Sequence, residues 1–75
     1  MRAIPYTTTG GAAQFRPAMS DSEYRESDNT GFCLACGESA DCVEPDARRY
    51  PCESCGARKV YGLEELLVMG LLTIE

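Results

Sequence analysis

The sequence predicts a small α+β domain, and three observations lead to this class. The chain has 75 residues, a length at which a hydrophobic core alone is marginal and a cross-link is usually needed. Of its five cysteines, four lie in two copies of the pattern C-x-x-C-G, at residues 33–37 and 52–56. Short strand-like segments surround these copies, and one leucine-rich segment near the C-terminus has helical spacing.

Residues 1–31 are expected to form an extended or flexible N-terminal arm, either loose or laid across the rest of the domain. They are rich in Thr, Gly, Ser and charge, and the TTTGG run at residues 7–11 favours extended or flexible backbone. Ser20 and Glu23 make a capping-box pattern, which predicts one helical turn over residues 21–26. The domain proper is therefore predicted to span residues 32–75.

Three antiparallel strands are predicted in this second part. The sequence EPDA at residues 44–47 has the composition of a turn, because proline presets φ at its second position. The flanking residues, 39–43 and 48–50, are predicted to pair as a hairpin. Residues 57–61 have strand character and are predicted to add the third strand of the sheet.

A short C-terminal helix is predicted to begin at Leu63, directly after Gly62. Two glutamates in its first turn complement the helix dipole, and Leu63, Leu66 and Leu67 have the i, i+3, i+4 spacing of a core-facing stripe. Gly70 is predicted to end the helix as its C′ residue.

The two C-x-x-C-G copies predict a metal site with Cys33, Cys36, Cys52 and Cys55 as ligands. The spacing C-x₂-C-x₁₅-C-x₂-C falls within the pattern of zinc sites, and four thiolates close a tetrahedral Zn²⁺ shell. We therefore expect one structural Zn²⁺ ion with no bound water to activate. Two alternatives are less favoured: iron in a rubredoxin-like site, which the short interval disfavours, and a thioredoxin-like redox motif, which needs a larger βαβ fold.

The composition of the chain counts against several classes of function. The formal net charge is −5 and the pI is near 4.6, which counts against general nucleic-acid binding, because such a body repels phosphate backbones. The chain has no histidine, so histidine-based acid–base catalysis is not available and no enzyme is expected. The first fifteen residues lack a secretory h-region and the apolar stretch at residues 66–72 is too short to cross a membrane. A cytoplasmic location with reduced thiols is therefore expected, which favours metal over disulfides.

Several further residues have two interpretations. Cys42 is expected to be a small buried hydrophobe, with a reactive thiol or a competing ligand as the alternatives. Val68, Met69 and Leu72 are expected either in the core or in an apolar patch for dimerisation or a partner. Acidic residues form two clusters, expected as solvated surface or as a docking face for a basic protein: Asp21, Glu23, Glu26 and Asp28, and Glu38, Asp41, Glu44 and Asp46. A basic group is expected as a solvated face or as a nucleic-acid patch with two tyrosines available for stacking: Arg48, Arg49, Tyr50, Arg58, Lys59 and Tyr61.

The stretch from Cys33 to Leu72, with its two C-x-x-C-G knuckles and the helix entry VYGLEELL at residues 60–67, resembles the zinc-ribbon superfamily. It is also similar to small, mostly uncharacterised zinc-ribbon proteins of bacteriophages and prophages. The resemblance implies a non-enzymatic binding module. The predicted function is a protein-binding accessory factor, such as a phage-type modulator or inhibitor of a host complex. The alternative is a nucleic-acid-binding zinc ribbon that assists transcription or replication.

Overall fold

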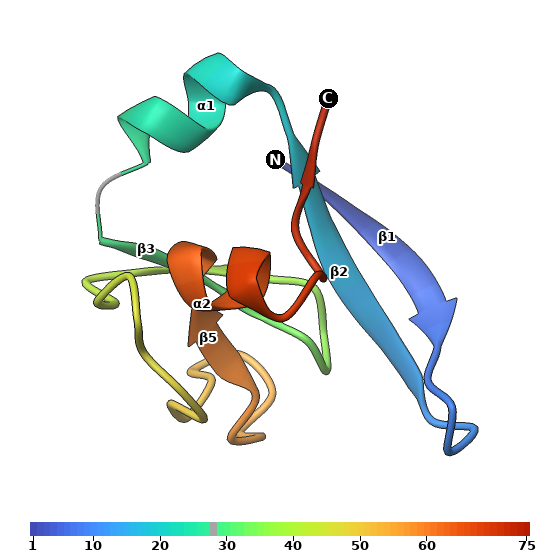
Figure 1. The fold of residues 1–75 in the computed structure, drawn as a ribbon. Helices are drawn as coiled ribbons and strands as arrows, with labels where there is room; N and C mark the ends of the chain where they lie inside the picture. Colours follow the sequence, from blue (N-terminus) through green and yellow to red (C-terminus); the bar gives the residue numbers. More distant parts are fainter. Residues whose placement is uncertain (28) are drawn as a thin grey trace.

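The computed structural model describes residues 1–27 and 29–75, which form two three-stranded sheets and two short helices (Figure 1). In chain order the elements are β1 (Arg2–Thr7), β2 (Ala13–Met19), α1 (Asp21–Glu26), β3 (Thr30–Cys33), β4 (Ser39–Asp41), β5 (Val60–Gly62), α2 (Leu63–Val68) and β6 (Thr73–Ile74).

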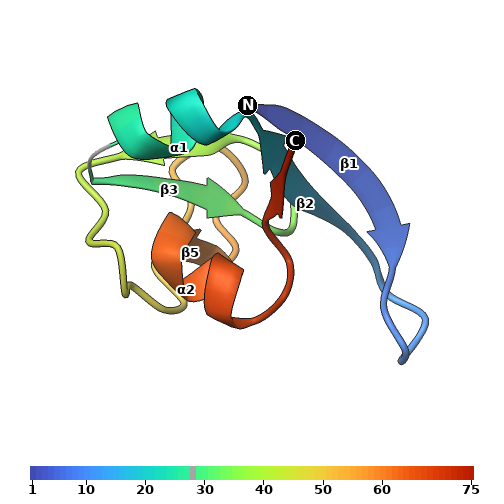
Figure 2. The same ribbon diagram turned by 45° about the horizontal axis from the view of Figure 1, so that its top comes forward.

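The first sheet has the strand order β1-β2-β6 and ties the two chain ends together. β1 and β2 form an antiparallel hairpin, and β6 runs parallel to β2, with Ala18 opposite Thr73. Arg2 forms an ion pair with Glu75, so both termini lie at the same end of this sheet (Figure 2). Residues 1–27 thus form an ordered hairpin and a helix.

The hairpin is joined to the rest of the chain by backbone contact with the first knuckle. The N–H of Phe15 donates to the carbonyl of Leu34 at 2.8 Å. A Cβ on Gly37 would meet the side chains of Ala3 and Phe15 at 3.1 and 3.2 Å, so the hairpin and the knuckle are in close contact. The predicted division of the chain at residue 31 stays a prediction, and β3 spans that position.

The second sheet has the order β4-β3-β5 and is antiparallel throughout. The predicted hairpin between residues 39–43 and 48–50 is wrong, because β4 pairs with β3 and not with the segment after the turn. Tyr50 instead forms an isolated bridge to Val60 at the other edge of β5. The physical reason is that Phe32 and Cys33 of β3 are buried on opposite faces, which makes β3 the central strand. The predicted single three-stranded sheet is therefore corrected to an antiparallel sheet next to a second, mixed one.

The predicted turn at residues 44–47 is confirmed, and it also caps α2. The N–H of Ala47 donates to the carbonyl of Glu44 at 3.0 Å, which closes the turn. The carbonyl of Pro45 then accepts from the N–H of Glu65 at 2.9 Å. Since Gly62 has no side chain to cap the helix, this backbone carbonyl satisfies one of the free N–H groups of the first turn.

Both helices form where the sequence predicts them. The capping box of α1 is present: the N–H of Glu23 donates to Ser20 Oγ at 3.1 Å, and Glu23 Oε1 accepts from the N–H of Ser20 at 3.4 Å. Gly70 takes φ +78° after α2, as a C′ glycine does. Leu67 was predicted in the core-facing stripe but is 42% exposed, because only Leu63 and Leu66 point toward the sheets.

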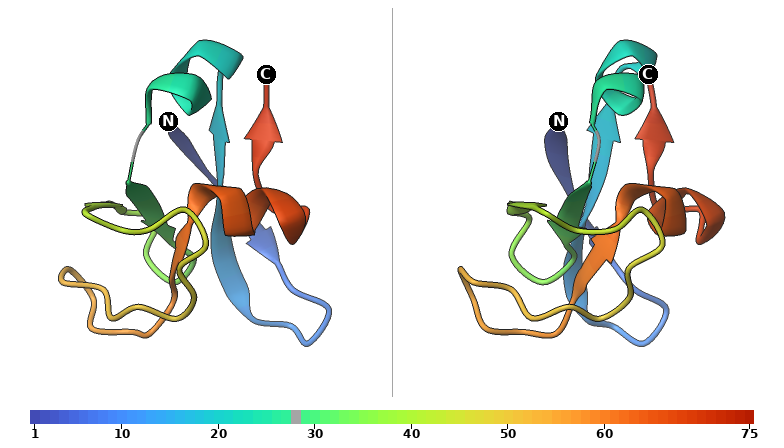
Figure 3. Two further views of the ribbon diagram at one scale, coloured as in Figure 1. Left: turned by 60° about the vertical axis from the view of Figure 1, so that its left-hand side comes forward. Right: turned by 90° about the vertical axis from the view of Figure 1, so that its left-hand side faces the viewer.

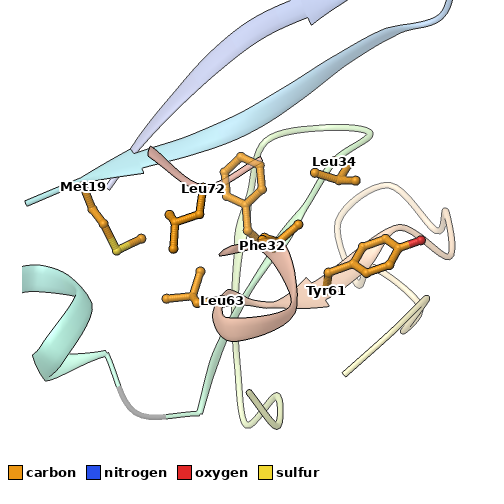
Figure 4. Close-up of a cluster of buried hydrophobic side chains, with 7 residues drawn as sticks. Met19, Phe32, Leu34, Tyr61, Leu63 and Leu72 are labelled. Carbon is orange, nitrogen blue, oxygen red and sulfur yellow. The ribbon is translucent and has the colours of Figure 1, made fainter. Parts of the chain in front are cut away.

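Two hydrophobic clusters lie on opposite faces of the second sheet. Phe32 and Tyr61 point into the first cluster, which is built from both halves of the chain (Figure 4). Cys33 and Val60 point into the second. The first cluster comprises Met19, Phe32, Leu34, Tyr61, Leu63, Leu66 and Leu72. The second comprises Cys33, Val43, Ala47, Cys52 and Val60.

Candidate metal centre

The two C-x-x-C-G segments fold into turns of the same geometry. In the first, the N–H of Gly37 donates to the carbonyl of Cys33 at 2.9 Å, and in the second the N–H of Gly56 donates to Cys52 at 2.8 Å. Gly37 and Gly56 have φ of +80° and +78°, a region that side-chain-bearing residues rarely adopt. The glycine after each second cysteine therefore allows the chain to leave the turn without strain.

The four cysteine sulfurs converge to form one cluster. The ligand atoms of Cys33, Cys36, Cys52 and Cys55 all lie within 4.8 Å of one another. Cys33 Sγ is 3.7 Å from Cys55 Sγ, and Cys36 Sγ is 3.6 Å from Cys52 Sγ. A tetrahedral ion with sulfur ligands at 2.3 Å requires sulfur–sulfur separations of about 3.8 Å. This four-cysteine group can therefore hold a metal ion.

The surroundings of the sulfurs shift the pKa values of Cys33, Cys36 and Cys52 in different directions. Backbone N–H groups of Cys55 and Ser54 donate to the Cys52 sulfur and, against some burial, lower its pKa to about 6. The N–H of Glu38 acts in the same direction on Cys36, but burial and the neighbouring sulfurs outweigh it and raise its pKa to about 12. Burial also raises the pKa of Cys33. Among these three thiols, Cys52 therefore loses its proton most readily, and a cation must displace the protons of Cys33 and Cys36.

The site joins two parts of the fold that the sheets alone connect weakly. Cys33 ends β3 and is fully buried, whereas Cys52 lies in a loop that reaches the sheet through the bridge between Tyr50 and Val60. The loops of residues 43–59 lie on the side of the second sheet away from the hairpin (Figure 3). A metal ion held by both knuckles would fix this loop region against β3.

The residues of the predicted basic group are not equally available for contact with a nucleic acid. Tyr61 is only 9% exposed because its ring lies in the first cluster, so it cannot stack on a base. Arg48 Nε is 2.8 Å from Glu65 Oε1, and the Tyr50 hydroxyl donates to the Glu44 carboxylate. Arg49, Arg58 and Lys59 are exposed.

Cys42 is exposed, which corrects its predicted burial. It has φ +59°, and the N–H of the next residue, Val43, donates to the carbonyl of Asn29 at 2.9 Å. This backbone reversal at the end of β4 acts as a bulge, which turns Val43 into the core and Cys42 outward. Period-two alternation of side chains cannot predict this change of face.

The acidic residues of both predicted clusters are exposed where the structure describes them. Within the first, Asp21 is paired with Arg25 at 3.0 Å and Glu23 with the N-terminal amine. Asp28 lies outside the described residues. Of the residues that widen the apolar surface of α2, Leu72 is buried in the core, whereas Val68 and Met69 are exposed.

A groove beside the metal centre could not be predicted from any short segment of the sequence. It has a volume of about 570 Å³ and lies between residues 39–43 and residues 50–54, with Val60 between them. Its two walls are brought together only by the fold.

No protein-family model matches this chain, and comparisons with curated proteins and with solved structures also gave no match. Among the described residues, no helix has the length and apolar character needed to cross a membrane.

Proposed function

We propose that this chain is a non-enzymatic binding module, held in shape by one structural Zn²⁺ ion, whose partner is a protein. The observation that carries the proposal is the convergence of four cysteine sulfurs within 4.8 Å. Four thiolate ligands fill a tetrahedral shell, so an ion bound there would have no open position for substrate or water. This donor set favours a structural role for the metal.

Zinc is favoured over iron by the surroundings of the sulfurs. The cluster that includes Cys33 and Cys52 contains the small aliphatic side chains Val43, Ala47 and Val60, and among the described residues it has no aromatic ring. Aromatic side chains are expected to pack around a rubredoxin-like iron, and this cluster does not supply them.

Three properties of the surface support a protein partner over a nucleic acid. The net charge is −5, and four thiolates with one Zn²⁺ would add two further negative charges. Tyr61 is buried and Arg48 is paired with Glu65, so fewer residues of the basic group are available to contact a nucleic acid. Leu67, Val68 and Met69 expose apolar surface at the end of α2, as expected of a contact with another protein. The narrower role, a phage-type modulator or inhibitor of a host complex, is supported by the resemblance of the knuckles and helix entry.

Binding to single- and double-stranded DNA and to RNA at low salt separates the protein-binding proposal from its alternative. The double variant Arg48→Glu and Arg49→Glu reverses two charges of the basic group, and Arg25→Glu on α1 is a control for charge reversal elsewhere. The proposal expects no micromolar binding of nucleic acid, and a specific protein retained from a cell lysate by the zinc-loaded chain. Micromolar nucleic-acid binding that the double variant loses and the control keeps would instead establish the nucleic-acid-binding alternative.

A further inference from the structure

Strand β4 forms one wall of the groove beside the metal centre. All five residues from 39 to 43 line this groove, which places the backbone of β4 in the wall, and residues 50–54 of the second knuckle form the other side. β4 is the last strand of the order β4-β3-β5, so its outer edge faces no further strand among the described residues.

Hydrogen bonds on either side of β4 define which of its backbone groups point outward. The N–H of Cys33 donates to the carbonyl of Glu38 at 2.9 Å, and Gly31 lies opposite Ala40 in the register. Because residues of an antiparallel ladder alternate between inward and outward bonding, the N–H and C=O of Ala40 face β3. Those of Ser39 and Asp41 therefore point to the open edge, where another strand can pair with them.

The side chains of the groove define the chemistry of what can pair there. Its lining includes two carboxylates, Asp41 and Glu53, and no basic side chain. Val60, with Ala40, offers apolar contact on the groove face of the sheet. Since successive side chains of a strand point to opposite faces, Asp41 lies on the face opposite Ala40. An added strand would meet apolar surface with its side chains on the groove face, and on the other face one of its side chains would lie next to the Asp41 carboxylate.

We propose that β4 accepts an extended segment of the partner protein as an additional strand, in which basic residues alternate with apolar ones. The inference rests on the proposed function, because it names the surface and the segment through which a protein partner would bind. Main-chain bonds to Ser39 and Asp41 give the segment its position, and the Asp41 carboxylate favours lysine or arginine in the row of side chains next to it. A second copy of this chain is disfavoured as the occupant, because each copy carries a charge of −5. Nucleic acids and anionic membranes are disfavoured for the same reason.

Two synthetic ten-residue peptides of equal composition, five lysines and five valines, test the pattern. One alternates the two residue types and the other groups them in blocks, and a third peptide alternates glutamate with valine. In NMR titrations of the zinc-loaded chain, we expect the alternating basic peptide to bind at least tenfold more tightly than the other two. Amide hydrogen exchange should slow at least tenfold at Ser39 and Asp41 and stay unchanged at Ala40, whose N–H is already paired.

Three variants locate the binding. Ser39→Pro removes one outward N–H and leaves the bonds between Ala40 and β3 in place, and Asp41→Lys reverses a groove charge. Glu64→Lys on α2 makes the same charge change outside the groove and is the matched control. We expect at least tenfold weaker binding for the first two and less than threefold for the control. Zinc content and far-ultraviolet circular dichroism verify that each variant is folded.

Several results would overturn the inference. Equal weakening by Asp41→Lys and Glu64→Lys would show attraction by overall charge, and equal affinity for the block peptide would exclude strand pairing. Binding without protection of Ser39 and Asp41 would place the peptide elsewhere, and a dimer that Ser39→Pro dissociates would make a second copy the occupant. If a protein from the lysate is retained equally by wild type, Ser39→Pro and Asp41→Lys, the proposed function stands and the groove is not its site. If nucleic acid binds and the peptides do not, both proposals fail.

Discussion

Replacement of Cys52 by serine removes one of the four sulfurs and is expected to unfold the region around the metal centre. Beside the sulfurs, the second cluster contains only three described buried side chains, Val43, Ala47 and Val60. The two buried valines together contribute about 3–6 kcal/mol. A structural zinc ion contributes about 10–16 kcal/mol, whereas the whole net stability of a domain is about 5–15 kcal/mol. The stabilisation lost with the ion is therefore larger than the stabilisation that the cluster can supply.

Metal content by elemental analysis and unfolding followed by circular dichroism measure this effect. The wild-type chain is expected to carry one zinc ion per molecule and to unfold on chelation, and Cys52→Ser is expected to carry none. Cys42→Ser is the matched control, because this exposed thiol lies outside the sulfur cluster. As a surface substitution it should change stability by no more than about 0.5 kcal/mol, or about 2–4 °C in Tm. A Cys52→Ser chain that keeps the wild-type fold, or a wild-type chain unchanged by exhaustive chelation, would refute the reasoning.

Three further predictions concern packing and the contact between Tyr50 and Glu44. Gly62→Ala should destabilise the chain by about 1–3 kcal/mol or more in urea unfolding. The reason is that a Cβ at position 62 would lie 2.2 Å from the carbonyl oxygen of Glu44. A variant of wild-type stability would contradict this packing. Leu66→Ala should lower the free energy of unfolding by about 2–5 kcal/mol, because the Leu66 side chain is fully buried. Val68→Ala should lower it by less than about 0.5 kcal/mol, because Val68 is 78% exposed. Equal losses would mean that α2 has a different orientation. The hydrogen bond between Tyr50 and the Glu44 carboxylate raises the pKa of Tyr50 above its ordinary 10.0 and lowers the pKa of Glu44 below its ordinary 4.5. The stabilisation from this contact is therefore complete between pH 4.5 and pH 10. It is lost as the pH rises through the raised pKa of Tyr50 or falls through the lowered pKa of Glu44. An NMR titration of the tyrosine rings should show the pKa of Tyr50 falling in Glu44→Gln, and an unchanged pKa would contradict the contact.

The parts of the fold that were predicted correctly depend on residues close together in the chain. The knuckle glycines Gly37 and Gly56, the turn at residues 44–47 and the capping box of Ser20 each arise within a few residues. The residue types at these positions have conformational preferences that act in any surroundings.

The missed features all depend on contacts between distant segments. β6 pairs with β2 although Ala18 and Thr73 are 55 positions apart in the sequence, and no local periodicity of side chains predicts such a pairing. Strand β3 took the central place because both of its faces became buried, which a four-residue segment cannot show in isolation. Tyr61 was counted among residues available for stacking, although the first cluster covers its ring.

By itself, the sequence determined the four candidate ligands, because C-x-x-C-G is a local pattern whose turn geometry directs both sulfurs inward. It also determined the position of both helices, through their caps and leucine spacing. Only the tertiary structure decided that the four sulfurs meet, that Cys42 faces outward and that β4 is an open edge beside a groove. These properties depend on which strands pair and on what each face packs against. The backbone N–H and C=O groups that pair the strands are the same in every residue but proline, so the order of side chains does not specify the pairing.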